Sequence, residues 1–197
     1  MQHPLSIASM KSARSTSAIE KEKAYQLLLN AGYILIGPGS PTYFVNEVKE
    51  TRISEMITRS IESGGSFVAA SAAALTVGQK TLPVYEIYKV GRDLHWVDGL
   101  DILGRFGINV VAIPHWNNAE GGTHDTRFCF MGEPRFRQLE ALLPEDTIFL
   151  GLDEHTACIV DLAENHVDIR GIGYVTIRQN GREMRFGRGD RLDVDGR

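Results

Sequence analysis

The stretch Ser66–Gly78 constrains the fold most, because an apolar run there meets a serine surrounded by alanines. Residues 66–69 have the composition of a buried strand, and the alanines after Ser71 are typical of the first turns of a helix. Such a sharp turn, a nucleophile elbow, needs small residues two positions before and after the serine, because the two backbones nearly touch. Ala69 and Ala73 occupy these positions, where glycine is usual. The stretch therefore predicts an exposed serine at a strand end, although a tightly packed crossing of strand and helix has the same pattern.

Apolar periodicity predicts that helices and strands alternate along most of the chain. Such alternation is typical of an α/β fold, in which functional groups collect at the carboxyl ends of the strands. We therefore predict a doubly wound, mostly parallel sheet with helices on both faces and a small antiparallel C-terminal extension. Residues 83–90 are aromatic and β-branched, which predicts a strand or an extended loop. The other predicted elements are helices over 17–30, 52–63 and 134–143, strands over 33–37, 66–69, 108–114 and 147–154, and short antiparallel strands after residue 166.

The length of the chain is typical of a single domain. The chain has 197 residues, and a domain of this size buries roughly 70% of the surface that its unfolded form exposes. Residues 1–16 are rich in serine and lack periodicity, so we expect a flexible arm there. Residues 17–197 show no repeat and no linker, and they are predicted to form a single hydrolase-like α/β domain.

Composition narrows the function classes. The net charge of -4, from 21 basic and 25 acidic side chains, favours neither nucleic acid nor an anionic membrane as a partner. The longest apolar run is too short to span a bilayer, and the first fifteen residues lack the apolar segment of a signal peptide. Cys129 and Cys158 are isolated, which indicates reduced cysteines. We therefore expect a cytoplasmic protein.

Side chains suited to catalysis follow three of the predicted strands. Ser71 and His115 each come directly after a buried strand, and a later strand ends in Asp153 and Glu154. A serine hydroxyl is a weak nucleophile unless a base takes its proton, and the base works best when a carboxylate fixes its tautomer. The placement at strand ends predicts that these groups meet. Taken singly, the histidine has the plainer reading of a hydrogen-bonded loop residue, and the glutamate that of a helix cap or a surface charge.

Four segments carry a resemblance to a known family. They are Gly37-Pro-Gly-Ser-Pro-Thr-Tyr43, the alanine-flanked Ser71, Ile-Pro-His115-Trp and Gly151-Leu-Asp-Glu154-His-Thr-Ala157. In this order, over about residues 20–180, they resemble the cyanophycinase and aspartyl dipeptidase (peptidase E) family of serine peptidases. That family has an α/β fold similar to that of class I glutamine amidotransferases.

The resemblance implies a role for individual residues. Ser71 would be the nucleophile, His115 the base and Glu154 the acidic member of a triad. Backbone N–H groups near Gly39 and Ala72 would form the oxyanion hole. No cofactor is implied, and a serine at the elbow argues against glutamine amidotransfer itself, which uses a cysteine there.

Two function classes remain open at this stage. The first is a serine hydrolase that cleaves a small peptide or isopeptide, in which Arg127 holds an acidic side chain and Asn117 is a second substrate-binding residue. An exposed arginine in a loop is the commoner case, and Arg127 is chosen by its nearness in sequence. The second is a non-catalytic module that binds an anionic metabolite or a partner through the loop that begins at Gly37. Reaction with a fluorophosphonate separates the two.

A metal site is the third interpretation of the polar loop 115–127. His115, His124 and Asp125 are the candidate ligands. Their spacing matches no common zinc pattern, and no helix is predicted to carry them. We therefore predict no metal.

The segment before residue 33 leads to an expectation about assembly. A parallel strand is normally covered on both faces and paired along both edges, yet few residues precede the strand 33–37 to do so. We expect an exposed apolar surface near the helix 17–30. A second copy of the chain in a two-fold dimer, or further residues of a longer protein, would cover it.

Overall fold

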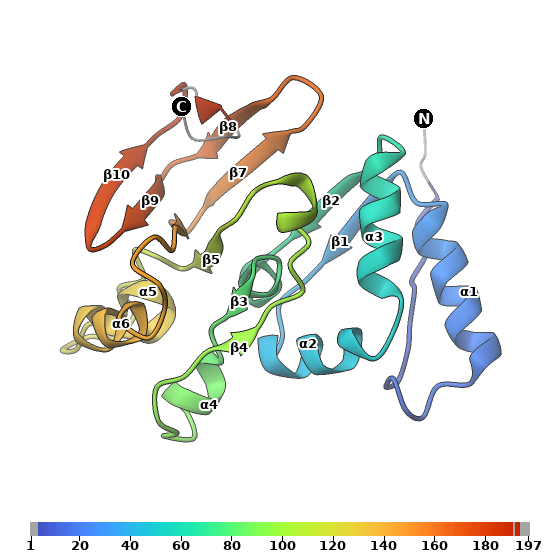
Figure 1. The fold of residues 1–197 in the computed structure, drawn as a ribbon, viewed down its shortest axis with the longest axis horizontal. Helices are drawn as coiled ribbons and strands as arrows, with labels where there is room; N and C mark the ends of the chain where they lie inside the picture. The colour runs from blue at the N-terminus through green and yellow to red at the C-terminus, as the bar shows by residue number, and fades with distance from the viewer. Residues whose placement is uncertain (1–3, 191, 194–197) are drawn as a thin grey trace.

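A computed structural model describes residues 4–190 and 192–193 (Figure 1). Residues 1–3 of the predicted arm, and residues 191 and 194–197 of the predicted domain, lie outside the described residues. The helices are α1 (Ala18–Leu29), α2 (Pro41–Lys49), α3 (Ile53–Glu62), α4 (Val84–Tyr88), α5 (Arg127–Phe130) and α6 (Gly132–Glu140), with the 3-10 helices η1 (Ser71–Thr76) and η2 (Gly104–Phe106). The strands are β1 (Tyr33–Ile36), β2 (Ser66–Ala69), β3 (Lys80–Thr81), β4 (Val97–Asp98), β5 (Val111–Pro114), β6 (Phe149–Leu152), β7 (Thr156–Asp161), β8 (His166–Gly171), β9 (Val175–Gln179), β10 (Arg182–Phe186) and β11 (Leu192–Asp193).

The fold is mixed α/β, and its sheets are smaller than predicted. β1 pairs in parallel with β2, and β5 pairs in parallel with β6, but the two pairs belong to different sheets. β9 pairs antiparallel with the other edge of β6 and carries β10, so C-terminal strands continue the β5–β6 sheet. The remaining sheets are β11-β8-β7 and the short β3–β4 pair. The described strands therefore form four small sheets where the sequence predicted one doubly wound, mostly parallel sheet.

Local signals explain where the first helices begin. Ser17 and Glu20 form a capping box at the start of α1, in which each side chain accepts the backbone N–H of the other residue. α2 starts at Pro41, a residue that suits the first helical position, and Ser40 caps it by accepting the Tyr43 N–H. The predicted flexible arm is packed at its C-terminal end, where Ala13 and Thr16 are buried.

Helices cover one face of the β1–β2 sheet. Ile34 is buried with Ile57 of α3 and Ile102, whereas Tyr33 is 61% exposed and Leu35 is 60% exposed. Neighbouring residues on a strand point to opposite faces, so the second face of β1 is bare. An exposed apolar surface therefore lies on this second face of β1.

The larger core lies under the β5–β6 sheet. All four residues of β5 are buried, and Phe136 of α6 packs between Phe128 and Phe149. Gly151 of β6 lies directly against the indole ring of Trp116. A Cβ at this position would clash with the ring, so only glycine fits there. This close contact ties the end of β6 to the residue that follows His115.

Arg178 of β9 has a buried side chain, 3% exposed, that closes one side of this core. It forms ion pairs with Glu133, Glu140 and Glu183 at 3.3, 2.7 and 3.0 Å. These carboxylates and hydrogen bonds hold the pKa of Arg178 well above its usual value, although burial acts in the opposite direction. A guanidinium with this many partners is satisfied in a buried position.

Two segments differ from the prediction in secondary structure. Residues 83–90 contain the helix α4 in place of a strand, because Val84 and Ile87 are buried at helical spacing and Pro83 stands before the first turn. The alanines after Ser71 form the 3-10 helix η1, which is tighter than the α-helix predicted.

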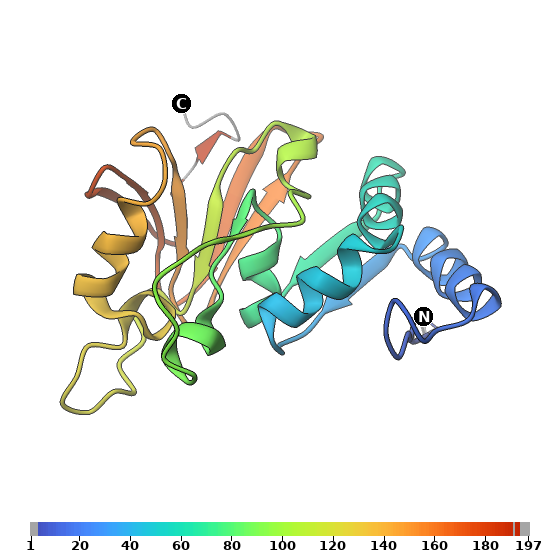
Figure 2. The same ribbon diagram turned by 60° about the horizontal axis from the view of Figure 1, so that its bottom comes forward.

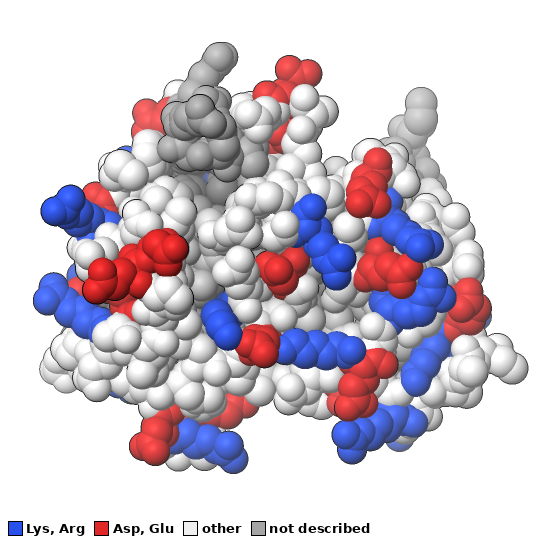
Figure 3. Space-filling model, in the orientation of Figure 1, with Lys and Arg blue, Asp and Glu red and all other residues white. Residues whose placement is uncertain are grey.

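Neither sign of charge dominates the face seen in Figure 3, where acidic and basic side chains are interspersed. Within residues 4–190 and 192–193, no helix is long and apolar enough to cross a membrane. Both cysteines are free thiols, and burial raises the pKa of Cys129 to about 12.

Candidate active site

Ser71 lies at a sharp turn directly after β2. Ala70 is still extended and its N–H donates to Ile36 O of β1, whereas Ser71 has a positive φ of 54° and begins η1. A left-handed conformation costs a residue with a side chain on the order of 1–3 kcal/mol, and such strain concentrates at functional sites. Ala73, two positions after the serine, is buried. The elbow geometry is therefore present with alanines beside it.

His115 brings an imidazole to this turn from the end of β5. Its Nε2 lies 2.8 Å from Ser71 Oγ, within the reach of about 2.6–3.2 Å that a base needs to take a proton from a nucleophile. His115 also has a positive φ of 53°. The imidazole is about one-third exposed, so a substrate can reach it.

Glu154 follows β6 and completes a chain of three side chains. Its Oε1 lies 3.0 Å from Nδ1 of His115. Hydrogen bonds from Asn118 and His115 lower the pKa of Glu154 below its usual value, so the carboxylate is charged at neutral pH. Asp153 lies on the opposite face, where it accepts the Tyr174 N–H at 3.0 Å. Of the two neighbouring acids, the structure brings Glu154 to the histidine.

Asn118 is a member of this group that the sequence analysis missed. Its Nδ2 donates to Glu154 Oε1 at 2.8 Å, the same oxygen that contacts His115. The side chain is 2% exposed, and its Oδ1 accepts the Glu120 N–H at 3.2 Å. A buried amide with both ends bonded holds a fixed orientation. Asn118 therefore restrains the carboxylate, and only its place in the polar loop after His115 hinted at this.

Asn117, predicted to bind substrate, is exposed and contacts the backbone of Glu154. Its Oδ1 accepts the backbone N–H of Glu154 at 2.8 Å. Asn117 and Asn118 thus bind the backbone and the side chain of the same glutamate. The loop after β5 is joined in this way to the end of β6.

A left-handed turn supports the histidine from behind. Phe128, Cys129 and Phe130 have consecutive positive φ values of 56°, 52° and 68°. The N–H of Phe128 donates to Trp116 O at 3.0 Å, and the N–H of Cys129 donates to His115 O at 3.1 Å. Left-handed geometry costs roughly 1–2 kcal/mol per residue, so these contacts must offset it. The turn places the Phe130 ring beside the imidazole, with 6.3 Å between the ring centroids.

A small cavity adjoins Ser71 on the side of β1 and α2. Its volume is about 280 Å³, and it lies between the loop 36–41, two aromatic residues of α2, and Ala72 and Ala73. Both predicted oxyanion residues, Gly39 and Ala72, line it. Ala72 is the second residue of η1, and the first N–H groups of a helix have no partner within it.

Arg127 is engaged by carboxylates of its own loop. Its guanidinium donates to Asp125 at 2.8 and 3.0 Å and lies 3.8 Å from Glu133. These contacts hold the pKa of Asp125 far below its usual range. Arg127, predicted to hold an acidic side chain of the substrate, thus has acidic partners in its own loop and in α6, and its side chain is half exposed.

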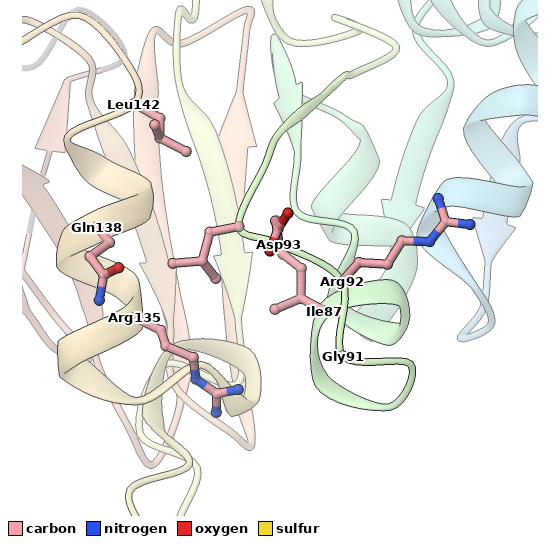
Figure 4. Close-up of a pocket in the computed structure, with 8 residues that line it drawn as sticks. Ile87, Gly91, Arg92, Asp93, Arg135, Gln138 and Leu142 are labelled. Atoms are coloured by element: carbon pink, nitrogen blue, oxygen red, sulfur yellow. The ribbon is translucent and has the colours of Figure 1, made fainter.

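A second hollow of about 610 Å³ lies apart from the three side chains. Figure 4 shows Arg135 and Gln138 of α6 across from Ile87 of α4 and Asp93 of the following loop. Arg135 donates to the Met131 and Phe130 carbonyl oxygens, so its head group is committed to the left-handed turn. Its lining residues include no serine, cysteine or histidine.

The candidate metal ligands do not form a cluster. His124 is exposed, and Asp125 is bound to Arg127 while His115 faces Ser71. In the part of the chain that the structure describes, no group of three or more His, Cys, Asp or Glu side chains is arranged to hold a metal ion.

Comparison with known proteins shows which solved structures have a similar fold. No family model matches the sequence, and no curated protein matches it. A solved peptidase from an acI-B1 Actinobacterium is similar, with 22% sequence identity and a TM-score of 0.69 over 90% of this chain and 66% of the peptidase. A protein from Listeria monocytogenes EGD-e that is provisionally called a peptidase E matches with 13% identity and a TM-score of 0.49, over 89% of this chain and 67% of that protein.

The likeness to the actinobacterial peptidase is a likeness of fold. The chain spans just under two thirds of the actinobacterial peptidase. At 22% identity, the shared property is the arrangement of helices and strands. This chain therefore has the fold of a solved peptidase.

Proposed function

We propose that the protein is a serine hydrolase that cleaves a small peptide or isopeptide through Ser71, His115 and Glu154. The observation that carries the proposal is the continuous chain of contacts from Ser71 Oγ to His115 Nε2 at 2.8 Å and from His115 Nδ1 to Glu154 at 3.0 Å. A nucleophile, a base and an orienting carboxylate in this order are recognised by their geometry, whatever the fold.

The geometry supports a two-step acyl transfer. Ser71 Oγ attacks the substrate carbonyl carbon while His115 Nε2 takes the hydroxyl proton. The imidazolium then gives this proton to the leaving amine as the C–N bond breaks, which leaves an ester on Ser71. Water then attacks the ester carbonyl carbon while the same imidazole takes its proton, and the imidazolium returns this proton to Ser71 Oγ as the acyl C–O bond breaks and the acid leaves. Glu154 keeps Nδ1 protonated, so that Nε2 is free to accept, and stabilises the positive charge that forms.

The backbone beside the serine suits the charge that develops on the substrate oxygen. Gly39 and Ala72 line one cavity next to Ser71. Two N–H groups directed at the oxygen stabilise a tetrahedral intermediate, and losing one such donor costs about 10²–10³ in turnover in other hydrolases. We assign these two N–H groups as the oxyanion hole.

A fluorophosphonate probe tests the proposal. At neutral pH it should label Ser71, as read by mass spectrometry of the labelled peptide. His115→Ala should abolish labelling without unfolding the protein, because the hydroxyl then has no base. Ser63→Ala, at an exposed serine after α3, is the matched control and should be labelled normally.

The same labelling experiment tests the alternative function, that of a non-catalytic binding module. A non-catalytic module that binds an anionic metabolite or a partner would leave Ser71 unlabelled in the folded protein. Unlabelled Ser71 at neutral pH, with the fold intact by circular dichroism, would therefore overturn the hydrolase proposal.

A further inference from the structure

Asn118, which binds the Glu154 carboxylate, is itself held at each of its polar groups. Its Nδ2 donates to Glu154, and its Oδ1 accepts the Glu120 N–H. Its backbone N–H donates to His115 O at 3.3 Å. Its backbone carbonyl oxygen accepts the hydroxyl of Thr126 at 3.2 Å. Thr126 therefore holds Asn118 from a position eight residues further along the chain.

The Thr126 side chain is buried and its hydroxyl forms two hydrogen bonds. The residue is 2% exposed. While Oγ1 donates to Asn118 O, it also accepts the Gly121 N–H at 3.1 Å. The methyl group of Thr126 lies against Gly121, where a Cβ would clash with it. A buried hydroxyl that both donates and accepts in this way has a fixed orientation.

These bonds close the base of an exposed loop. Residues 119, 120 and 122–125 are exposed, whereas Asn118 and Thr126 on either side of them are buried. The loop, drawn in yellow, projects from the body of the molecule (Figure 2). A segment with few buried contacts opens readily unless its ends are held. The Thr126 hydroxyl joins the two ends of this loop, so it fixes the end that carries Asn118.

The backbone of Thr126 makes a separate contact with the turn behind His115. Its carbonyl oxygen accepts the Phe130 N–H at 2.9 Å, and in the same turn the Cys129 N–H donates to His115 O. This contact does not involve the Thr126 side chain, so it persists when the side chain is replaced. The hydroxyl itself is connected to the site through Asn118.

We infer that Thr126 is a positioning residue of the proposed active site: its hydroxyl holds Asn118, and through Asn118 it fixes the Glu154 carboxylate that orients His115. The inference rests on the proposed function, because it requires His115 to act as the base for Ser71. A displacement of about 1 Å in a catalytic group can lower a rate by roughly 10²-fold. Loss of the hydroxyl should therefore slow the chemical step, although Thr126 takes no part in proton transfer.

The kinetics of fluorophosphonate labelling test the inference. The labelling rate at saturating probe reports the activation of Ser71, and the half-saturating probe concentration reports access to the site. Thr126→Val keeps the shape of the side chain and removes its hydroxyl. We expect the maximal labelling rate to fall by about tenfold or more, with the half-saturating concentration unchanged. Thr126→Ser keeps the hydroxyl and should retain most of the rate.

Thr176→Val is the matched control. Thr176 is also fully buried, and its hydroxyl has no hydrogen-bond partner within the described residues. Removal of this hydroxyl should leave the labelling rate unchanged. If Thr126→Val does not fold, Thr126→Ser and Thr126→Ala form a second matched pair, because both lack the methyl group and they differ in the hydroxyl alone. The serine variant should then be labelled about tenfold faster or more.

A double-mutant cycle separates positioning through Asn118 from a general loss of structure. Asn118→Ala already releases the Glu154 carboxylate from its amide partner. Adding Thr126→Val to it should therefore lower the labelling rate by no more than about twofold. Two losses that multiply in full would show that the hydroxyl acts by another route, and they would overturn the inference.

The outcomes separate the inference from the proposed function. If Ser71 is labelled and Thr126→Val keeps the maximal rate of the unmodified protein, the inference alone is overturned. The same holds if Thr126→Ser is as slow as Thr126→Val. If Ser71 of the unmodified, folded protein is not labelled at all, the proposed function fails and the inference fails with it.

Discussion

The two parallel strand pairs of this protein differ in how they are packed. All four residues of β5 are buried, whereas β1 has one fully buried residue, Ile34, and an exposed face. The β5–β6 sheet is extended by β9 and β10, but β1 and β2 pair only with each other in the described chain. α1 lies at the end of the molecule farthest from the β5–β6 sheet (Figures 1 and 2). The β5–β6 pair thus lies in a hydrophobic core, whereas one face of β1 in the β1–β2 pair is exposed to solvent.

The candidate active site lies where these two regions meet. Ser71 follows β2, while His115 and Glu154 follow β5 and β6. The regions are in close backbone contact at Gly78, where an added Cβ would come within 2.1 Å of Val110 O. The base and its carboxylate therefore belong to the well-packed region, and the nucleophile depends on the contact between the two.

The largest expected effect concerns the acid in the well-packed region. Glu154→Gln should lower turnover by about 10⁴-fold, the loss seen when a triad loses its orienting charge. The protein should remain folded, because Glu154 is partly exposed. Asp153→Asn is the comparison: it should keep most of the activity of the folded fraction, since Asp153 faces Tyr174. A greater loss in Asp153→Asn than in Glu154→Gln, measured as kcat, would reverse the assignment.

The next effect tests the contact between the regions. Gly78→Ala should destabilise the protein by about 1–3 kcal/mol, since the backbone of Val110 must move to admit a methyl group. It should also reduce fluorophosphonate labelling in the protein that remains folded. Gly32→Ala is the control, because a Cβ there would meet nothing within 4 Å. Equal unfolding free energies for the two variants in urea would show that the contact does not join the regions tightly.

Asn118 should affect activity less than Glu154 does. Asn118→Ala should lower kcat by about 10–100-fold, the range seen when an outer hydrogen-bond partner of a functional group is lost. Asn46→Ala, at an exposed asparagine of α2, should have no effect.

A pH profile distinguishes orientation of the carboxylate from a general loss of structure. The pKa of Glu154 is lowered in the folded protein, so the stability that its charge contributes is present above the pKa of an ordinary glutamate and lost as the pH falls through the lowered value. Asn118→Ala removes the largest cause of this lowering. The loss of unfolding free energy between neutral and acid pH should therefore be smaller in Asn118→Ala than in the unmodified protein, as measured by urea unfolding at several pH values. An equal loss in the two proteins would contradict this role for Asn118.

The smallest effect on stability is expected on the bare face of β1. Leu35→Glu should change the free energy of unfolding by no more than about 0.5 kcal/mol, because exposed substitutions rarely do more. If a second copy of the chain covers this face, light scattering should show a dimer that the substitution dissociates. A monomer at micromolar concentration before the substitution would contradict the dimer.

The residues missed by sequence reasoning are those whose roles depend on distant segments. Phe128, Cys129 and Phe130 carry no local signal for left-handed geometry, since aromatic side chains disfavour it. Backbone contacts from His115 and Trp116 impose the conformation. The aromatic and β-branched composition of residues 83–90 predicts a strand or an extended loop, because it masks the helical spacing of the two buried residues of α4.

The sequence by itself determined the alternating elements, the strand ends at which Ser71, His115 and Glu154 lie, and the small residues of the elbow. These properties are local, because they follow from apolar periodicity and from the size of neighbouring side chains. Tertiary structure decided that the sheet is divided, that Asn118 holds the carboxylate, and that Arg127 is already paired. These properties depend on which strands pair and on which charged side chains form ion pairs. Both are determined by contacts between residues that are far apart in the chain.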